Sequence, residues 1–139
     1  MQFTIKEIER QVRIKTLDTD ADAYRYAPIE VYQAIRDGVR LIWHKKPESR
    51  YVDGLMVSKG LLIGGAQADF VVPETFPVTI GSTSYDNAAY VALTINMEER
   101  YMEPLVYYVI HQMYLKDDTD TANSGLAKTY YEKFMEALS

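Results

Sequence analysis

The segment from Pro104 to Lys116, PLVYYVIHQMYLK, is the feature that most restricts the fold. As a helix it is surrounded by apolar or amphipathic side chains, and only His111, Gln112 and Lys116 interrupt them. A helix that is hydrophobic nearly all round is covered on several sides. Because it is shorter than the roughly 20 apolar residues that cross a bilayer, its cover has to be protein. We therefore expect a central buried helix.

The bulk composition indicates one ordinary globular domain. The chain has 139 residues, of which 47% are hydrophobic and 25% are charged. It contains no cysteine, which excludes disulfides and thiolate metal sites within it. The first residues are polar and charged, so we expect no signal peptide, no membrane anchor, and synthesis in the cytoplasm.

Charge is unevenly distributed along the chain. The formal net charge of -5 argues against nucleic-acid binding by the whole surface. Residues 36–50 contain five basic and two acidic side chains, whereas residues 69–103 contain six acidic side chains and one basic one. Such patches can meet between neighbouring copies in a head-to-tail ring, and two separate solvated faces explain the pattern equally well.

The first helix is predicted from Thr4 to about Lys15. Thr4 and Glu7 have the spacing of a capping box, and Phe3 with Ile8 has the spacing of a hydrophobic staple. The buried face is formed by residues at helical spacing, namely Ile5, Ile8 and Val12. The charged residues are expected away from that face, namely Lys6, Glu9, Arg10 and Arg13.

An acidic turn follows. Asp18, Asp20 and Asp22 resemble the opening of an EF-hand calcium loop. That loop also requires Gly at its sixth position and Glu at its twelfth, where this chain has Ala23 and Ile29. We therefore prefer a solvated acidic turn to a calcium site.

The second helix is predicted from Pro28, which suits a first turn, to about Lys46, because Pro47 disfavours a helical conformation in the residue before it. The short connection between the first two helices predicts that they pack antiparallel. Trp43 is expected as a core or interface anchor. The buried face comprises Tyr32, Ile35, Val39, Ile42 and Trp43.

Glycine and proline divide residues 51–95 into short pieces. Gly64-Gly65 predicts a hairpin turn, because no phosphate-loop motif surrounds it. The segment reads either as a strand-rich insertion or as a mobile arm that orders on a partner. The predicted strands are Leu61 to Ile63, Phe70 to Val72, Val78 to Ile80 and Tyr90 to Ile95.

The C-terminal part is predicted to be helical. Asn96 is expected to cap a short turn with Glu99, and Pro104 to restart or kink the helix after it. Asp120 or Thr121 is the expected cap of a last helix. Its apolar stripe is formed by Leu126, Tyr130, Phe134 and Leu138.

These elements predict a mainly α (α+β) fold in a single domain. It is expected to be a bundle of about four helices around the central one, with a short-strand or loop insertion in the middle. Residues 1–50 form a helical pair, residues 51–95 the insertion or arm, and residues 96–139 the central and C-terminal helices.

Catalytic residues do not form a recognisable pattern. His44, beside two lysines, is expected on the surface, and His111, inside the apolar helix, is expected as a core or interface histidine. Motifs for nucleophilic or metal-dependent hydrolysis are absent from the sequence. We therefore predict no enzyme activity and no cofactor or metal site.

The order of motifs resembles one known family. RYAPIEVYQAIRDGVRLIWHKKPES is similar to the second-helix region of tailed-bacteriophage head-to-tail connector (adaptor) proteins, with its D-G-x-R-x-I ending and basic-Pro-acidic exit. MEERYMEPLVYYVIHQMYLKDD and ANSGLAKTYYEKFMEAL look like the last two helices of that family. The resemblance covers about three quarters of the chain, which is the size of a small domain. Residues 51–89 do not align with it.

This resemblance implies a structural virion protein. Such proteins form a closed ring of about twelve copies under the portal protein, extend the DNA channel without binding DNA specifically, and present a platform to a tail or stopper protein. The implied location is the virion neck, with no membrane contact. The alternatives from other classes are a monomeric helical regulatory binding module, and a calcium-dependent protein or small enzyme.

Subunit and partner contacts are predicted at aromatic and basic residues. Tyrosine and tryptophan suit surfaces that are partly apolar and partly wet, and basic side chains suit acidic groups of a neighbour. The predicted interface residues are Arg36, Arg40, Trp43, Lys45, Lys46, Tyr107, Tyr108, Tyr114, Tyr130 and Tyr131.

Overall fold

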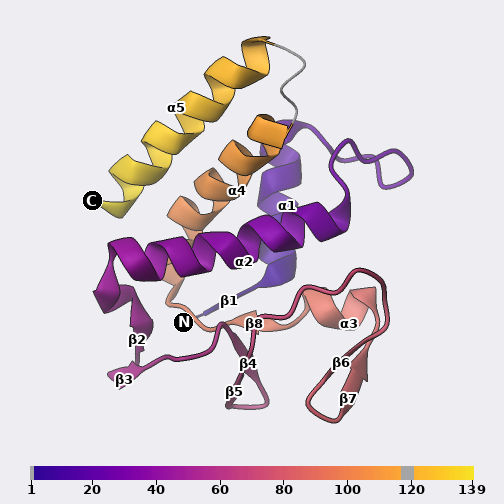
Figure 1. The fold of residues 1–139 in the computed structure, drawn as a ribbon, viewed down its shortest axis with the longest axis vertical. Coiled ribbons are helices and arrows are strands. Elements are labelled where there is room, and N and C mark those ends of the chain that lie inside the picture. Colours follow the sequence, from indigo (N-terminus) through magenta and orange to yellow (C-terminus); the bar gives the residue numbers. More distant parts are fainter. Residues whose placement is uncertain (1, 117–120) are drawn as a thin grey trace.

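A computed structural model of the chain describes residues 2–116 and 121–139. Helix predominates over short strands, as Figure 1 shows. The helices are α1 (Ile5–Thr16), α2 (Pro28–Lys45), α3 (Asn87–Val91), α4 (Met102–Lys116) and α5 (Thr121–Leu138), with 3₁₀ turns at Pro47–Arg50 and Glu99–Tyr101. The strands are β1 (Phe3–Thr4), β2 (Tyr51–Val52), β3 (Leu55–Met56), β4 (Leu61–Ile63), β5 (Ala66–Ala68), β6 (Val78–Ile80), β7 (Thr83–Tyr85) and β8 (Thr94–Ile95).

Helix α4 is the buried centre of the helical part, as its all-round apolar pattern predicts. Its side chains at Leu105, Val109, Ile110 and Met113 are completely buried. Helices α1, α2 and α5 all contact it. The helix begins at Met102, directly after the 3₁₀ turn, and Pro104 lies in its first turn, where the missing N–H costs no helical hydrogen bond.

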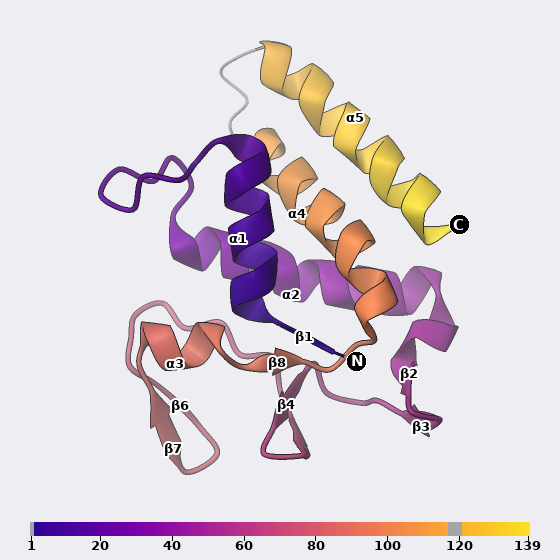
Figure 2. The ribbon, with the colours of Figure 1, turned by 180° about the vertical axis from the view of Figure 1, so that it is seen from behind.

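The first two helices do not pack antiparallel, so that prediction was wrong. Helices α1 and α4 run side by side in the same direction, α5 returns along α4, and α2 crosses α1 and α4 (Figures 1 and 2). Gly38 marks the close approach of α2 to α4: a Cβ atom there would lie 2.6 Å from Leu105 Cδ1 and 2.9 Å from Tyr108 Cδ2. The absence of a side chain at Gly38 thus lets α2 cross close to α4.

The N-terminus of α1 follows the predicted pattern. The Thr4 side chain accepts a hydrogen bond from the Glu7 N–H, and the predicted apolar face is buried. Strand β1 pairs antiparallel with β8, which pairs with β4, so Phe3, Ile95 and Leu61 lie in register across three strands. The N-terminal end of the chain is therefore joined to its middle.

Asn96 is not a helix cap, which corrects the prediction. Its side chain is buried, accepts a hydrogen bond from Gln2 Nε2 at 3.0 Å and donates one to the Lys59 carbonyl at 3.1 Å. Glu98, which has no capping hydrogen bond from its side chain, precedes the 3₁₀ turn. Asn96 thus connects the start of the chain to the segment before β4.

Three hairpins, β2–β3, β4–β5 and β6–β7, lie along the lower edge of the molecule in Figures 1 and 2, with α3 beside β6–β7. The predicted strands β4 and β6 are confirmed, and Gly64 and Gly65 form the predicted turn with φ of 58° and 83°. The β2–β3 turn was not predicted. Its Asp53 and Gly54 have φ of 51° and 79°, and Asp-Gly is a strong sequence signal for this turn.

Two predicted strands are wrong. Residues 70–72 form no strand, and most of the segment from 90 to 95 is the end of α3 and a turn, with only Thr94–Ile95 in β8. The Asp86 side chain caps α3 by accepting from the Ala89 N–H at 2.8 Å. Tyr90 is buried, and its hydroxyl donates to the Val71 carbonyl at 2.6 Å. This capped turn outweighs the alternating pattern.

Helix α5 packs on α4 through a slightly different stripe from the one predicted. Ala127, Phe134 and Leu138 are buried and Tyr130 is half-buried, whereas Leu126 is 39% exposed. Ala127 therefore takes the place that the four-residue repeat gave to Leu126. The predicted caps at residues 120 and 121 involve side chains outside the described part of the chain.

Alkaline pH is expected to destabilise the protein through Tyr32 and Tyr90. Burial raises the pKa of both hydroxyls above the ordinary value of 10.0, and the nearby Glu9 carboxylate adds to the effect on Tyr32. The folded state therefore keeps both phenols neutral, while the unfolded chain ionises them above about pH 10. The contribution of these two tyrosines to the free energy of unfolding is constant below that pH. Above it, the free energy of unfolding should fall by about 1.4 kcal/mol per pH unit for each tyrosine. Urea denaturation across this range measures the slope.

The matched variant is Tyr90→Phe, which keeps the ring and removes the ionisable group. Its alkaline slope should be smaller than that of the wild type by the contribution of one tyrosine. An unchanged slope in this variant would contradict the assignment.

Candidate interaction surface

The outward face of α2 presents most of the predicted basic contacts. Val39 and Ile42 turn inward, while Arg40 and Lys45 are exposed. Arg36 forms an ion pair with its neighbour Asp37, Nε to Oδ1 at 3.3 Å, and Lys46 Nζ lies 3.9 Å from a Glu48 carboxylate oxygen. Within residues 2–116 and 121–139, Arg40 and Lys45 have no carboxylate partner. These two cations are therefore available to another molecule.

Trp43 joins this face to the β2–β3 hairpin. The Arg50 guanidinium lies 5.1 Å from the centre of the Trp43 ring, and Arg50 Nε donates to the Val57 carbonyl at 3.1 Å. The Val57 N–H returns a 2.6 Å hydrogen bond to the Arg50 carbonyl. The hairpin is thus anchored at its base beside the half-buried indole of Trp43.

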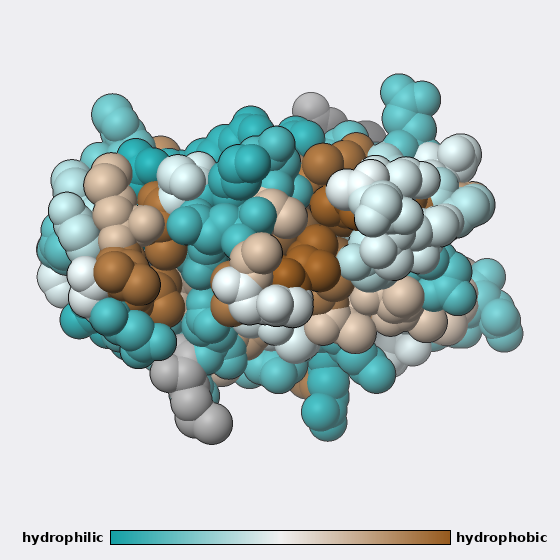
Figure 3. All heavy atoms as spheres, turned by 90° about the horizontal axis from the view of Figure 1, so that it is seen from below, coloured by the Kyte–Doolittle hydropathy of each residue, from teal (hydrophilic) through white to brown (hydrophobic). Residues whose placement is uncertain are grey.

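The hairpin exposes large apolar side chains. Leu55 is 74% exposed, Met56 57% and Tyr51 48%. In the view from below, one of the separate hydrophobic areas lies at the left, on the β2–β3 side of the molecule (Figure 3). Between the hairpin and α2 is a cavity of about 480 Å³ lined by Arg40, Trp43, His44, Pro47, Arg50, Tyr51 and Met56. Its apolar wall and basic rim suit an apolar side chain that is followed by carboxylates.

The five predicted tyrosines lie elsewhere, in the seam between α4 and α5. The ring of Tyr130 lies 6.0 Å from that of Tyr107 and 5.9 Å from that of Tyr114, and Tyr108 packs 5.3 Å from Phe134. Tyr114 is buried, and the other four, including Tyr131, are half-buried. The structure therefore uses these rings within one chain and does not bring them together with the α2 surface.

The two histidines lie as the sequence predicted. His44 is exposed and is one of the residues that line the cavity. His111 is half-buried, its Nδ1 atom lies 2.7 Å from the Ala127 carbonyl oxygen of α5, and its ring packs 4.9 Å from Tyr131. His111 thus connects the two helices.

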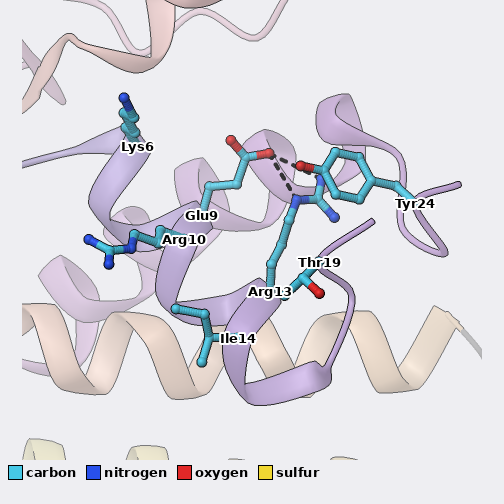
Figure 4. Close-up of a pocket in the computed structure, with 7 residues that line it drawn as sticks. All are labelled: Lys6, Glu9, Arg10, Arg13, Ile14, Thr19 and Tyr24. Atoms are coloured by element: carbon cyan, nitrogen blue, oxygen red, sulfur yellow. Dashed lines mark hydrogen bonds and ion pairs between the residues drawn. The ribbon is translucent and has the colours of Figure 1, made fainter. Parts of the chain in front are cut away.

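A second hollow, of about 340 Å³, surrounds Arg13 on α1 (Figure 4). Sequence reasoning placed Arg13 on the exposed side, but only 5% of the residue is exposed. Its guanidinium contacts a Glu9 carboxylate oxygen at 3.1 Å and Asp18 Oδ2 at 2.7 Å, and stacks 3.5 Å from the centre of the Tyr24 ring. The four-residue spacing of Glu9 and Arg13 was the available signal.

The ion pair also fixes the acidic turn. Asp18 accepts hydrogen bonds from the backbone N–H groups of Arg25 and Tyr26 at 2.7 and 3.1 Å, in addition to Arg13. The Asp18 carboxylate is buried and bonded to these groups, while Asp20 and Asp22 remain exposed. The prediction of a fully solvated turn is therefore wrong for Asp18, because burial of Arg13 requires an anionic partner.

Among the described residues, no three His, Asp or Glu side chains are grouped so that they could hold a metal ion. None of the described helices combines the length and apolar character needed to cross a bilayer. Comparisons with family models, with curated proteins and with solved structures found no match to this chain.

Proposed function

We propose that this chain is a structural subunit that assembles with copies of itself into a ring. The observation that carries the proposal is the surface formed by the C-terminal part of α2 and the β2–β3 hairpin. It combines exposed Leu55 and Met56 with Arg40 and Lys45, which lack carboxylate partners among the described residues. Exposed large apolar side chains beside uncompensated cations are typical of a surface that a partner covers.

The ring is proposed to be a head-to-tail connector of a tailed-bacteriophage virion. The segments that resemble that family coincide with α2, α4 and α5, in the same order. In this role the ring lies under the portal protein, continues the DNA channel, and carries a tail or stopper protein. The net charge of -5 fits a channel through which DNA passes without adhering.

Sedimentation velocity of the purified chain over a wide concentration range tests the proposal. The expected result is one closed species of many subunits, because a repeated contact between unlike surfaces closes into a ring. A protein that remains monomeric throughout would contradict it and favour a monomeric regulatory binding module.

Charge reversal at Lys45 and Lys46 tests the electrostatic part. We expect the double variant Lys45→Glu/Lys46→Glu to raise the concentration needed for assembly by about tenfold at low salt and by only about twofold at high salt, since salt screens exposed charges. The matched control is Lys6→Glu/Lys128→Glu, which changes two exposed lysines on α1 and α5. A loss of assembly independent of salt would contradict the electrostatic contribution.

A further inference from the structure

Leu17 has an unusual conformation at the end of α1. Its φ and ψ are 58° and 31°, in the left-handed region, and its side chain is 87% exposed. Gly or Asn usually occupies this position, because the left-handed backbone conformation is unfavourable for most other residues, leucine included. A large apolar residue that is both strained and exposed points to a role outside the folded monomer.

The residues around Leu17 make the end of α1 and the turn after it, here called the tip, both apolar and acidic. Ile14, one turn earlier, is 52% exposed, and Asp20 and Asp22 are exposed directly after it. Within the described ranges neither carboxylate forms an ion pair, and Asp20 Oδ1 accepts only the Asp22 N–H, at 3.1 Å. The tip is thus an apolar projection followed by uncompensated negative charge.

The cavity beside the β2–β3 hairpin has the complementary chemistry. Trp43 and Met56 contribute apolar side chains to its lining, and Arg40 and His44 contribute polar ones. Arg40 has no carboxylate partner in the part of the chain that the structure describes. An apolar side chain in the cavity would place the carboxylates that follow it near the basic side chains.

These two surfaces cannot meet within one molecule. Leu17 lies in the connection that enters the N-terminal end of α2, whereas the cavity lies at the C-terminal end of α2 (Figure 1). Helix α2 has 18 residues and is therefore about 27 Å long. The occupant of the cavity has to be a separate molecule.

We propose that Leu17 of one copy inserts into the cavity between α2 and the β2–β3 hairpin of the next copy, with Asp20 and Asp22 facing Arg40. This inference rests on the proposed self-assembly and names the surfaces that produce it. Because the two surfaces differ, an open assembly has a free Leu17 projection at one end and a free cavity at the other. The contact therefore repeats until a ring closes.

The variant Leu17→Asn separates assembly from folding. Asn tolerates the left-handed conformation and removes the apolar projection, so the melting temperature should be unchanged or higher while the concentration needed for assembly rises at least about tenfold. The matched control is Val71→Asn, which changes an apolar residue of 38% exposure outside both surfaces and should assemble as the wild type does. Assembly of Leu17→Asn at wild-type concentrations would overturn the inference.

A mixing experiment identifies the two sides. Leu17→Asn lacks the projecting leucine but keeps the cavity, whereas Arg40→Glu/Met56→Glu has an altered cavity but keeps Leu17. Each variant alone should therefore be monomeric. An equimolar mixture should form a 1:1 dimer and nothing larger, because only one productive contact remains. A mixture that stays monomeric, or that assembles into rings, would overturn the inference. If the wild type forms rings whatever the mixture does, the proposed ring assembly stands even when the Leu17 contact is overturned. A monomeric wild type would contradict both the ring assembly and the Leu17 contact.

Discussion

Replacing Arg13 with alanine is expected to lower the free energy of unfolding by about 3–5 kcal/mol. The substitution leaves the Asp18 carboxylate, which is only 7% exposed as a residue, without its guanidinium partner. It also removes the hydrogen bond to the Tyr26 carbonyl and the cation that stacks on Tyr24. The acidic turn and the start of α2 lose their attachment to α1. Urea denaturation of the purified variant measures the effect.

Arg10→Ala is the matched control, since Arg10 is an exposed arginine on the same helix, and it should change stability by no more than about 0.5 kcal/mol. The double variant Arg13→Ala/Asp18→Ala should cost less than the sum of the two single changes, because it leaves no buried charge without a partner. Equal losses for Arg13→Ala and Arg10→Ala would show that the ion pair does not hold the turn.

Phe134→Ala is expected to be comparably damaging, with a loss of about 3–5 kcal/mol. Phe134 is completely buried in the α4–α5 seam, where its ring lies 5.3 Å from that of Tyr108 and 5.9 Å from that of Tyr131. Truncation opens a cavity beside Tyr108 and Tyr131, each of which loses its ring contact with Phe134. Chemical denaturation gives the loss, and the near-ultraviolet circular dichroism of the tyrosines reports the seam itself.

The neighbouring residue supplies the control for this prediction. Met135 follows Phe134 on α5 and is 38% exposed, so Met135→Ala should cost less than about 1 kcal/mol. If the two substitutions were equally mild, α5 would not depend on the aromatic seam for its attachment.

The elements that the sequence predicted correctly are those whose signals are local. Thr4 caps the helix that follows it, Pro28 occupies the first turn of its own helix, and Gly64-Gly65 forms its own turn. In each case the residue type and its immediate neighbours determine the backbone conformation. The all-round apolar character of α4 belongs to the same class, since it follows from composition alone.

The wrong predictions concern residues whose conformation or burial is determined by tertiary contacts. Residues 90–95 alternate like a strand, but Asp86 caps a helical turn and Tyr90 is drawn into a ring cluster with Tyr32 and Phe76. Arg13 lies off the apolar stripe of its helix, and it is buried because the chain returns with Asp18 five residues later. Periodicity assigns a face to a residue, but it does not reveal which loop will cover that face.

The candidate surface was half predictable. The basic residues and Trp43 of α2 follow from sequence, while the hairpin beside them was overlooked although Asp53-Gly54 signals its turn. The left-handed conformation of Leu17 could not be predicted, because leucine does not favour it. Nor does a tyrosine-rich pattern distinguish a seam between two helices of one chain from a contact between subunits.

The position of α4 in the sequence has a consequence for synthesis. Helices α1 and α2 bury their apolar faces against α4, which is completed only at Lys116. At roughly 5–20 residues per second, translation from the end of α2 to the end of α4 takes on the order of 4–14 s. For that time the nascent chain carries Ile8, Ile35 and Val39 without their final cover. Apolar residues that stay uncovered for this long favour aggregation of a nascent chain, so the late synthesis of α4 extends the period in which this chain is vulnerable.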